Sequence, residues 1–352
     1  MKETYQNQII EEKKSKLLFK RPSEYLTENV PPMEWLIDGL VPKASLEAVI
    51  APMKAGKTTL IRAMIASIVT GENEFIGKEI NQQLIGNKSI AYMAIEDPVG
   101  QVRHAFADLG INETHDNFHL FQGDQQMPKD TVNEIVKWIE ENEPAILVID
   151  TILHIGEGKV TPNDGDKVMF FLQPLLFVAR RTGTTVIFLY HTSKKARNDS
   201  GYNALFAVNG SQQWNASVDV TINMFREGKE GDETYSYQVQ GRIPDIPKTA
   251  LELDPETGRM SSVGTVEEVK FSRILRDVST CIDEASEPLK TEDIVTDTQH
   301  TKAKVLQALK DLVSKGTIFR NNARGLRGNP VLYSKDCFEQ VNQGGLFDEP
   351  IE

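Results

Sequence analysis

The sequence predicts an α/β protein in which a mostly parallel sheet is flanked by helices and followed by a small α+β unit. From about residue 45 onward, short apolar runs alternate with longer helix-patterned segments, as in the β-α units that build a parallel sheet. After residue 232 the pattern changes to antiparallel hairpins, and the C-terminal region is typical of two helices followed by two strands. We therefore expect one large sheet domain and one smaller domain.

The predicted elements follow this order along the chain. Strands are expected at residues 45–51, 89–96, 145–150, 184–191 and 218–225. Helices are expected to begin near Lys57, Val99, Asp130 and Asp164. The expected domains are an N-terminal arm or linker helix (1–28), the sheet domain (29–262), the small domain (266–336) and a flexible acidic tail (337–352).

Composition limits the classes of protein that the chain can be. Its 352 residues, 39% of them apolar, suffice for domains with buried cores. The net charge of −12 argues against a surface that is basic throughout, so contact with nucleic acid would need a local basic patch. The two cysteines lack metal-ligand spacing, and the longest apolar stretch, residues 168–179, is too short to span a bilayer. We expect a cytoplasmic protein with no membrane partner.

The stretch APMKAGKTT matches the phosphate-binding loop G-x-x-x-x-G-K-[ST] except at its first glycine. An apolar strand precedes it and an apolar helix follows, which is the context that such a loop requires. Backbone N–H groups of the loop would bind the phosphates of ATP, Lys57 would neutralise them, and the Thr58 hydroxyl would bind Mg²⁺. Alanine is tolerable at position 51 if its φ stays negative. The predicted ATP-binding residues are Ala51, Pro52, Met53, Lys54, Ala55, Gly56, Lys57, Thr58 and Thr59. A chance match in a surface loop is the alternative.

Two further carboxylates follow predicted strands. Asp150 ends the run AILVID and is expected to hold Mg²⁺ through water, although a strand-terminal aspartate can also cap a turn. Glu96 and Asp97 precede Pro98 at the end of another strand, at the sheet edge where ligands bind in open α/β folds. We assign Glu96 as the base that orients the attacking water. Asp97 suits the alternative role of a helix N-cap, because aspartate is a preferred capping residue.

The order of these motifs, with the WLIDGLVPKASLEAVIAPMKAGKTTL, AYMAIEDP, AILVIDTILH and TTVIFLYHTSK segments, resembles the RecA-like ATPases of the RepA type. These are hexameric replicative helicases of plasmids, with phage relatives. The resemblance covers about residues 29–262. It implies that His191 senses the γ-phosphate and couples it to DNA-binding loops, whereas a satisfied histidine at a strand end is the simpler interpretation.

The resemblance also implies a homo-oligomer in which an arginine reaches the neighbouring subunit's ATP. The segment NGSQQWNASVDVTINM departs from the RepA type, because Asp219 falls where that branch carries its arginine. Arg242, on a late hairpin, corresponds to the position where DnaB-type relatives present one. A solvated surface arginine is the alternative. If Arg242 is the finger, the active form is a ring, by resemblance a hexamer.

A loop over residues 192–211 is a candidate contact for single-stranded DNA. It combines cations for the phosphate backbone with rings for stacking, and a flexible surface loop with solvated charge is the alternative. The cations are Lys194, Lys195 and Arg197.

The C-terminal region resembles a winged helix-turn-helix that could also contact duplex DNA. Between Gln299 and Lys335 eight Lys or Arg residues face one Asp or Glu, which makes this piece about +7 and supplies the local basic patch. The alternative is a winged domain used for protein contact. Its predicted DNA contacts are Lys302, Lys304, Arg320, Arg324 and Arg327. The expected buried stripe of its second helix is Leu306, Leu309, Leu312 and Val313.

The last residues contain Q-G-G-L-F, which resembles the Q-x-x-L-F peptide that docks replication and repair proteins to the bacterial sliding clamp. Its anchors are Gln343, Leu346 and Phe347, and a chance match in an acidic tail is the alternative.

Three functions follow from these motifs. The first is an ATP-hydrolysing helicase or translocase on single-stranded DNA in plasmid or phage replication. The second is a DNA-binding ATPase that loads, recruits or regulates without unwinding. The third is a nucleotide-binding scaffold without turnover, which the intact loop and acids disfavour. The sequence leaves open the polarity of translocation, the subunit number, the replicon served and any DNA sequence preference.

Overall fold

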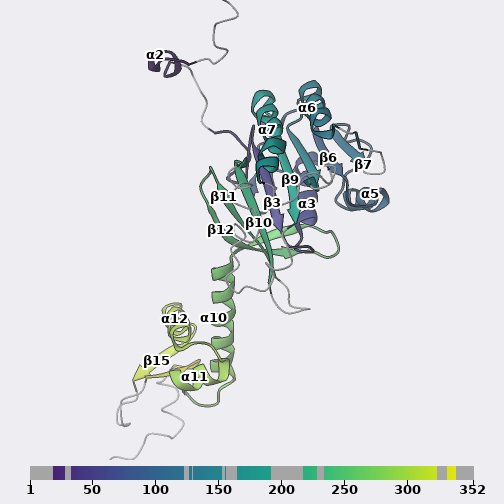
Figure 1. Cartoon of the computed structure of the whole chain (residues 1–352). Coiled ribbons are helices and arrows are strands. Elements are labelled where there is room, and N and C mark those ends of the chain that lie inside the picture. Colours follow the sequence, from purple (N-terminus) through teal and green to yellow (C-terminus); the bar gives the residue numbers. More distant parts are fainter. Residues whose placement is uncertain are drawn as a thin grey trace, which may run out of the picture.

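A computed structural model of the chain describes residues 19–27, 33–122, 127–128, 130–152, 155, 165–191, 217–227, 234–322 and 331–337. Within these residues a nine-stranded sheet forms the centre of the molecule (Figure 1), in the order β13-β12-β11-β10-β3-β9-β8-β6-β7. From β10 to β7 all neighbours pair in parallel, whereas β11, β12 and β13 extend the sheet with antiparallel pairs. The predicted α/β class with a mostly parallel sheet is confirmed.

The strands of this sheet are named here with their bounds. The parallel strands are β3 (Leu46–Ala51), β6 (Ile90–Ala94), β7 (Phe118–Gln122), β8 (Ile146–Asp150), β9 (Thr185–His191) and β10 (Val220–Glu227). The antiparallel strands are β11 (Thr234–Gly241), β12 (Ile246–Leu253) and β13 (Met260–Thr265). Every residue of β3, β6 and β8 is buried, because these central strands are covered on both faces, and their continuous apolar runs reflect that position.

Helices cover both faces of the parallel part of the sheet. Helices α3 (Lys57–Val69) and α5 (Val99–Asp108) contribute to the hydrophobic core on one face. Helices α6 (Thr131–Asn142) and α7 (Gly165–Thr182) contribute to the core on the other face and pack against each other (Figure 1). All four begin within one residue of their predicted starts, because each follows a strand end or a turn that the sequence marks with Gly, Pro or Asp.

Short elements complete the N-terminal part. Two small hairpins, β1-β2 and β4-β5, lie outside the main sheet and were not predicted. The bounds are α2 (Pro22–Tyr25), β1 (Trp35–Ile37), β2 (Val41–Pro42), β4 (Glu74–Phe75), β5 (Lys78–Glu79) and α4 (Gln82–Ile85).

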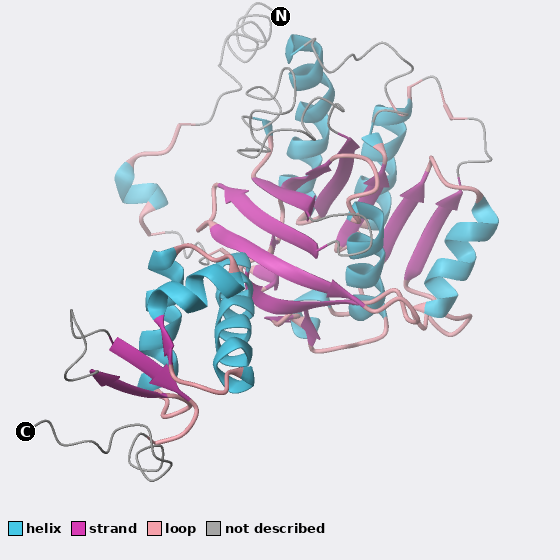
Figure 2. Ribbon diagram, turned by 90° about the horizontal axis from the view of Figure 1, so that it is seen from below, coloured by secondary structure: helices cyan, strands magenta, loops and turns pink. Residues whose placement is uncertain are grey.

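The C-terminal elements have a hydrophobic core of their own (Figure 2). They follow one another as helix, short strand, helix, helix and two strands, with the three strands paired in the order β14-β16-β15. The bounds are α10 (Val266–Glu284), β14 (Leu289–Lys290), α11 (Thr291–Thr298), α12 (Lys302–Ser314), β15 (Phe319–Asn322) and β16 (Val331–Ser334). Helix α10 begins directly after β13, where the Thr265 side chain accepts a hydrogen bond from the Glu268 backbone N–H in a capping box.

The predicted buried stripe of α12 is wrong at one position. The Leu306 side chain is 44% exposed, whereas Val305 and Ala308 are fully buried beside Leu309 and Leu312. The helix is therefore rotated by about one residue from the predicted face. Ala308 is a weak apolar signal in the sequence, and the larger Leu306 drew the prediction to the wrong side.

Candidate ATP site

The candidate site lies where four parallel strands end at the same edge of the sheet. In the paired register, Ala51 at the end of β3 is level with His191 at the end of β9, and Ala94 of β6 is level with Asp150 of β8. Each strand is followed at this edge by one of the segments that carry the predicted functional side chains. The parallel arrangement thus gathers residues that are far apart in the sequence, as the strand-end rule predicts.

The loop between β3 and α3 resolves the question raised by the alanine at its start. Ala51 is the last residue of β3, is fully buried and does not have a positive φ, so that no glycine is needed there. Gly56 has a φ of 84° and is the N-cap of α3, with no side chain capping the helix. The first turn of a helix leaves backbone N–H groups without intrahelical partners, and such groups bind phosphate. The loop therefore keeps the anion-binding geometry of the motif.

Lys57, the first residue of α3, is buried to 3% exposure and turned back into the loop. Its Nζ donates to the carbonyl oxygens of Ala51 at 3.1 Å and Pro52 at 3.3 Å, and lies 2.9 Å from His191 Nδ1. Burial lowers the pKa of Lys57 to about 8, although the negative charges of Asp150 and Glu96 act in the opposite direction. The lysine is thus a buried cation that neighbouring acids only partly stabilise, which suits it to a polyphosphate.

His191 lies between Lys57 and Glu96. A charged lysine has only protons to donate, so His191 Nδ1 accepts from it and the ring proton is assigned to Nε2. Nε2 lies 3.5 Å from the Glu96 Oε2 atom. Burial, followed by the charge of Lys57, lowers the pKa of His191, so the ring is neutral at pH 7. The histidine therefore connects the predicted phosphate-binding cation to the predicted base.

Asp150 is 4% exposed and is held by two hydroxyl groups. Tyr92 Oη donates to its Oδ2 atom at 2.5 Å, and the Thr58 side chain also hydrogen-bonds to the carboxylate. Burial raises the pKa of Asp150, while these hydrogen bonds and Arg62 oppose the rise. The predicted magnesium ligands Thr58 and Asp150 are thus in contact, which fits a small oxygen-liganded cation bound by one carboxylate and one hydroxyl together with phosphate oxygens.

Sequence reasoning missed several residues around this site. Asp97 does not cap α5, because Pro98 is the N-cap and Asp97 forms an ion pair with Arg62 of α3 at 2.6 Å. Tyr235 of β11 and Met260 of β13 lie against the loop, each with a side-chain atom 3.1 Å from the position that a Gly56 Cβ would occupy. These partners come from distant strands, and no local sequence pattern marks them.

Asp219 and Arg242 lie at the opposite edge of the sheet. Gly241 is level with Val220 of β10 and Glu47 of β3, near the amino end of β3, whereas the loop follows its carboxyl end. Asp219 accepts hydrogen bonds from Arg180 at 2.9 Å, from Arg242 at 3.1 Å and from the Leu46 backbone N–H at 3.1 Å. The aspartate found in place of the expected arginine is therefore a structural acceptor. Arg242 is 57% exposed and cannot serve the ATP site of its own chain.

The predicted DNA contacts are only partly within the described residues. Lys194, Lys195, Arg197, Arg324 and Arg327 lie outside them, as do the predicted clamp anchors Gln343, Leu346 and Phe347. Three predicted contacts are described and exposed: Lys302, Lys304 and Arg320. The Lys302 ammonium forms an ion pair with Glu292 of α11 at 2.8 Å.

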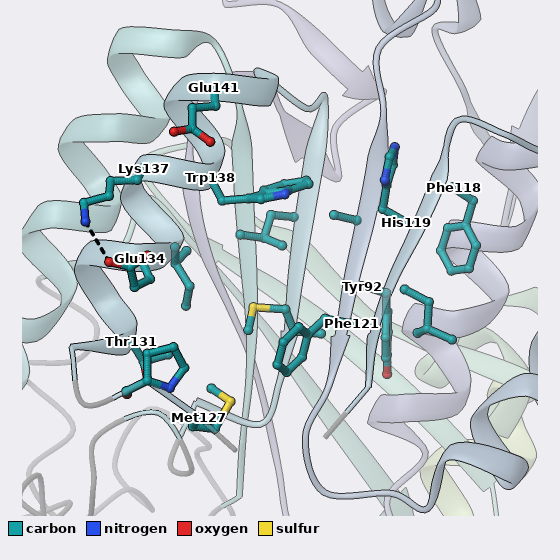
Figure 3. Close-up of a pocket in the computed structure, with 16 residues that line it drawn as sticks. Tyr92, Phe118, His119, Phe121, Met127, Thr131, Glu134, Lys137, Trp138 and Glu141 are labelled. Carbon is teal, nitrogen blue, oxygen red and sulfur yellow. Dashed lines mark hydrogen bonds and ion pairs between the residues drawn. The ribbon is translucent and has the colours of Figure 1, made fainter. Parts of the chain in front are cut away.

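A separate groove lies between α6 and the edge strands β6 and β7 (Figure 3). It has a volume of about 630 Å³ and is lined mainly by apolar side chains, among them Phe121, Met127 and Trp138, with a Lys137–Glu134 ion pair at its rim. No residue of the phosphate-binding loop lines it, and neither do Glu96, Asp150 or His191. The groove is therefore distinct from the candidate ATP site.

In the described part of the chain, no helix combines the length and the apolar character needed to cross a lipid bilayer.

A strand, a phosphate-binding loop and a helix, with a buried lysine and strand-end acids around them, define a P-loop ATPase. Residues 11–197, more than half of the chain, match the AAA domain family, and the chain belongs to that family.

Solved structures with a similar fold are distant in sequence. One is a KaiC-like protein from the hyperthermophilic archaeon Pyrococcus horikoshii, which is 14% identical with a TM-score of 0.45 over 64% of this chain and 93% of that one. Another is the ATPase domain of a second protein, 14% identical with a TM-score of 0.46 over 63% of this chain and 86% of that one. The search of curated proteins gave no match.

Proposed function

We propose that this ATPase hydrolyses ATP with Mg²⁺ and uses the energy to translocate on single-stranded DNA, as a helicase of the RepA type. The observation that carries the proposal is the continuous contact from Lys57 through His191 to Glu96. It joins the group that would bind the γ-phosphate to the group that would orient the attacking water. A bound phosphate that draws Lys57 away from His191 would free the histidine to move, and that movement could be transmitted to the DNA.

The residues present assign the roles within this site. The backbone N–H groups of the loop and Lys57 would hold the phosphates, and Thr58 and Asp150 would hold Mg²⁺. When bound, Mg²⁺ would supply charge stabilisation for phosphoryl transfer. Glu96, whose side chain is 42% exposed at the sheet edge, would orient water for in-line attack. His191 would remain neutral and donate through Nε2.

We further propose that the active form is a ring, as the resemblance implies. Arg242 is exposed at the edge of the sheet opposite the loop, which is where a residue must lie to reach a neighbouring subunit's ATP. Its ion pair with Asp219 would hold the guanidinium in place before the ring assembles. The loop residues Lys194, Lys195 and Arg197 would then contact the DNA strand.

The C-terminal elements, over 266–336, would serve as a winged helix-turn-helix. Their order, with α11 and α12 followed by β15 and β16, supports this assignment. Exposed Lys304 and Arg320 would contact phosphate groups of the DNA, whereas Lys302 would first have to leave Glu292. The tail would dock on a sliding clamp through Leu346 and Phe347.

A second function is an ATP-dependent switch that loads or recruits other proteins without unwinding DNA. The engagement of Asp219 by Arg180 and Arg242 favours it, because the residue that replaces the RepA-type arginine already has a structural role. In that case the winged elements would locate a duplex site and the ATP state would control release.

The rate of ATP hydrolysis as a function of protein concentration, with and without single-stranded DNA, tests these functions. A rate that rises with assembly and with DNA supports the ring motor, and the Lys57→Ala variant should abolish it. Slow turnover that ignores single strands would favour the switch. Strand displacement from a forked duplex then separates the two, and an absence of turnover in every condition would refute both.

A further inference from the structure

Four side chains form a continuous chain of hydrogen bonds from the segment after β6 to the predicted magnesium ligand. Asp97 Oδ2 accepts from Arg62 Nη2 at 2.6 Å. Arg62 Nε donates to Tyr92 Oη at 3.4 Å, and Tyr92 Oη donates to Asp150 Oδ2 at 2.5 Å. The chain thus joins the residue next to Glu96 to the acid on β8.

The direction of these hydrogen bonds follows from the chemistry of the groups. A guanidinium has donors and no acceptor, so the Tyr92 oxygen must accept from Arg62. The single proton of the hydroxyl is then free to point at Asp150. The carboxylate therefore always receives at Oδ2, and its rotation about the last side-chain bond is restricted.

The network lies inside the protein rather than at its surface. Tyr92 is fully buried and Arg62 is 9% exposed. The Arg62 guanidinium carbon also lies 5.7 Å from the ring centre of Tyr92 and 6.0 Å from that of Phe106. Water is not available to replace a lost partner at these positions, and packing fixes the orientation of each donor. Such an arrangement holds a group in one place.

We propose that Tyr92 and Arg62 are positioning residues, which orient the Asp150 carboxylate toward Mg²⁺ and connect it to the segment that carries Glu96. The inference rests on the proposed ATP site. The contact has a consequence for both groups, because a displacement of Glu96 moves Asp97 and thereby the donor that orients Tyr92. The base and the metal ligand would therefore adopt their working positions together.

The Tyr92→Phe substitution tests the proposal, because it removes the hydroxyl and keeps the ring. Binding of a fluorescent ATP analogue is titrated first in EDTA and then with increasing Mg²⁺. Binding in EDTA should stay within about twofold of the wild type, since the loop and Lys57 are unchanged. The Mg²⁺ concentration that gives half of the metal-dependent change should rise about tenfold or more, as for other partners that orient metal ligands.

Tyr237→Phe is the matched control. Tyr237 is equally buried on β11, its hydroxyl bonds to Thr249, and it belongs to no part of the ATP site. Both variants should lose similar thermal stability, and the shift in Mg²⁺ dependence should appear in Tyr92→Phe alone. Equal Mg²⁺ dependence in wild type and Tyr92→Phe would overturn the proposal.

Asp97→Asn tests the far end of the network without touching Asp150. It weakens the ion pair to Arg62 at a side chain that is 39% exposed, so that folding is retained. A smaller shift in the same direction is expected, and an unchanged Mg²⁺ dependence would refute the connection. A wild-type protein whose ATP binding ignores Mg²⁺ would instead contradict the proposed ATP site, which keeps the two failures distinct.

Discussion

The depressed pKa of Lys57 predicts how the affinity for ATP depends on pH. Burial holds this pKa at about 8 in the free protein, instead of 10.5. Phosphate binding requires the charged lysine, and the bound phosphate would raise its pKa again. The free protein is mostly charged at Lys57 below pH 8 and loses the proton as pH rises through 8. Affinity is therefore expected to be nearly constant below pH 8 and to fall above it.

The size of the effect follows from the proton linkage. With a pKa of about 8, the dissociation constant for ATP should rise about eightfold between pH 7.5 and pH 9, and binding at pH 8 should take up about half a proton. His191 does not contribute in this window, because its pKa is lowered from 6.5 and the ring is already neutral.

Isothermal titration calorimetry in EDTA measures both quantities, the proton uptake by comparing buffers of different ionisation enthalpy. Lys57→Arg is the control, since an arginine stays charged throughout this range and should remove the slope. A dissociation constant that does not change between pH 7.5 and pH 9, with no proton uptake at pH 8, would refute the assignment of Lys57 as a buried cation that binds phosphate.

Three further predictions concern stability, each measured by urea denaturation. Leu309→Ala should destabilise the protein by about 2–5 kcal/mol and Leu306→Ala by less than about 1 kcal/mol, because only the first side chain is buried, and equal losses would contradict the observed face of α12. Burial raises the pKa of Glu47 well above 4.5, so the wild type should lose about 1.4 kcal/mol per pH unit from 4.5 up to the folded pKa. Glu47→Gln should lack this slope, and parallel pH profiles would rule it out. Lys54 has a φ of 63°, and Lys54→Gly should stabilise the protein by about 0.5–1 kcal/mol, whereas a loss would show that the side chain makes a contact that outweighs the strain.

The sequence predicts the parallel sheet well because buried strands have a distinct composition. Runs such as LEAVIA and ILVID are apolar throughout, since both faces are covered, and glycine, proline or aspartate marks their ends. Strand β7, with the sequence FHLFQ, was missed because it lies at the sheet edge and includes polar residues. Edge strands give a weaker signal than central ones, for the physical reason that one side has no partner strand.

The candidate site was predictable where it depends on strand ends and not where it depends on packing. Lys57, Glu96, Asp150 and His191 follow or end apolar runs, and parallel strands bring such positions together. The Tyr92 hydroxyl has no such signal, because its partners lie 30 and 58 residues away along the chain. A tyrosine in a buried strand has the same pattern whether its hydroxyl orients a metal ligand or only completes a hydrogen bond.

Strand β13 gives the molecule a short mechanical connection. At one end Met260 lies against Gly56 of the phosphate-binding loop, and at the other Thr265 caps α10. The strand has six residues and spans about 20 Å. It is paired to β12 along its length, and so it has no hinge at which a displacement could be absorbed. Any shift of Met260 that accompanies filling of the loop would therefore be carried as a push or a pull to the base of α10, and the C-terminal elements would swing with the nucleotide state like the end of a lever.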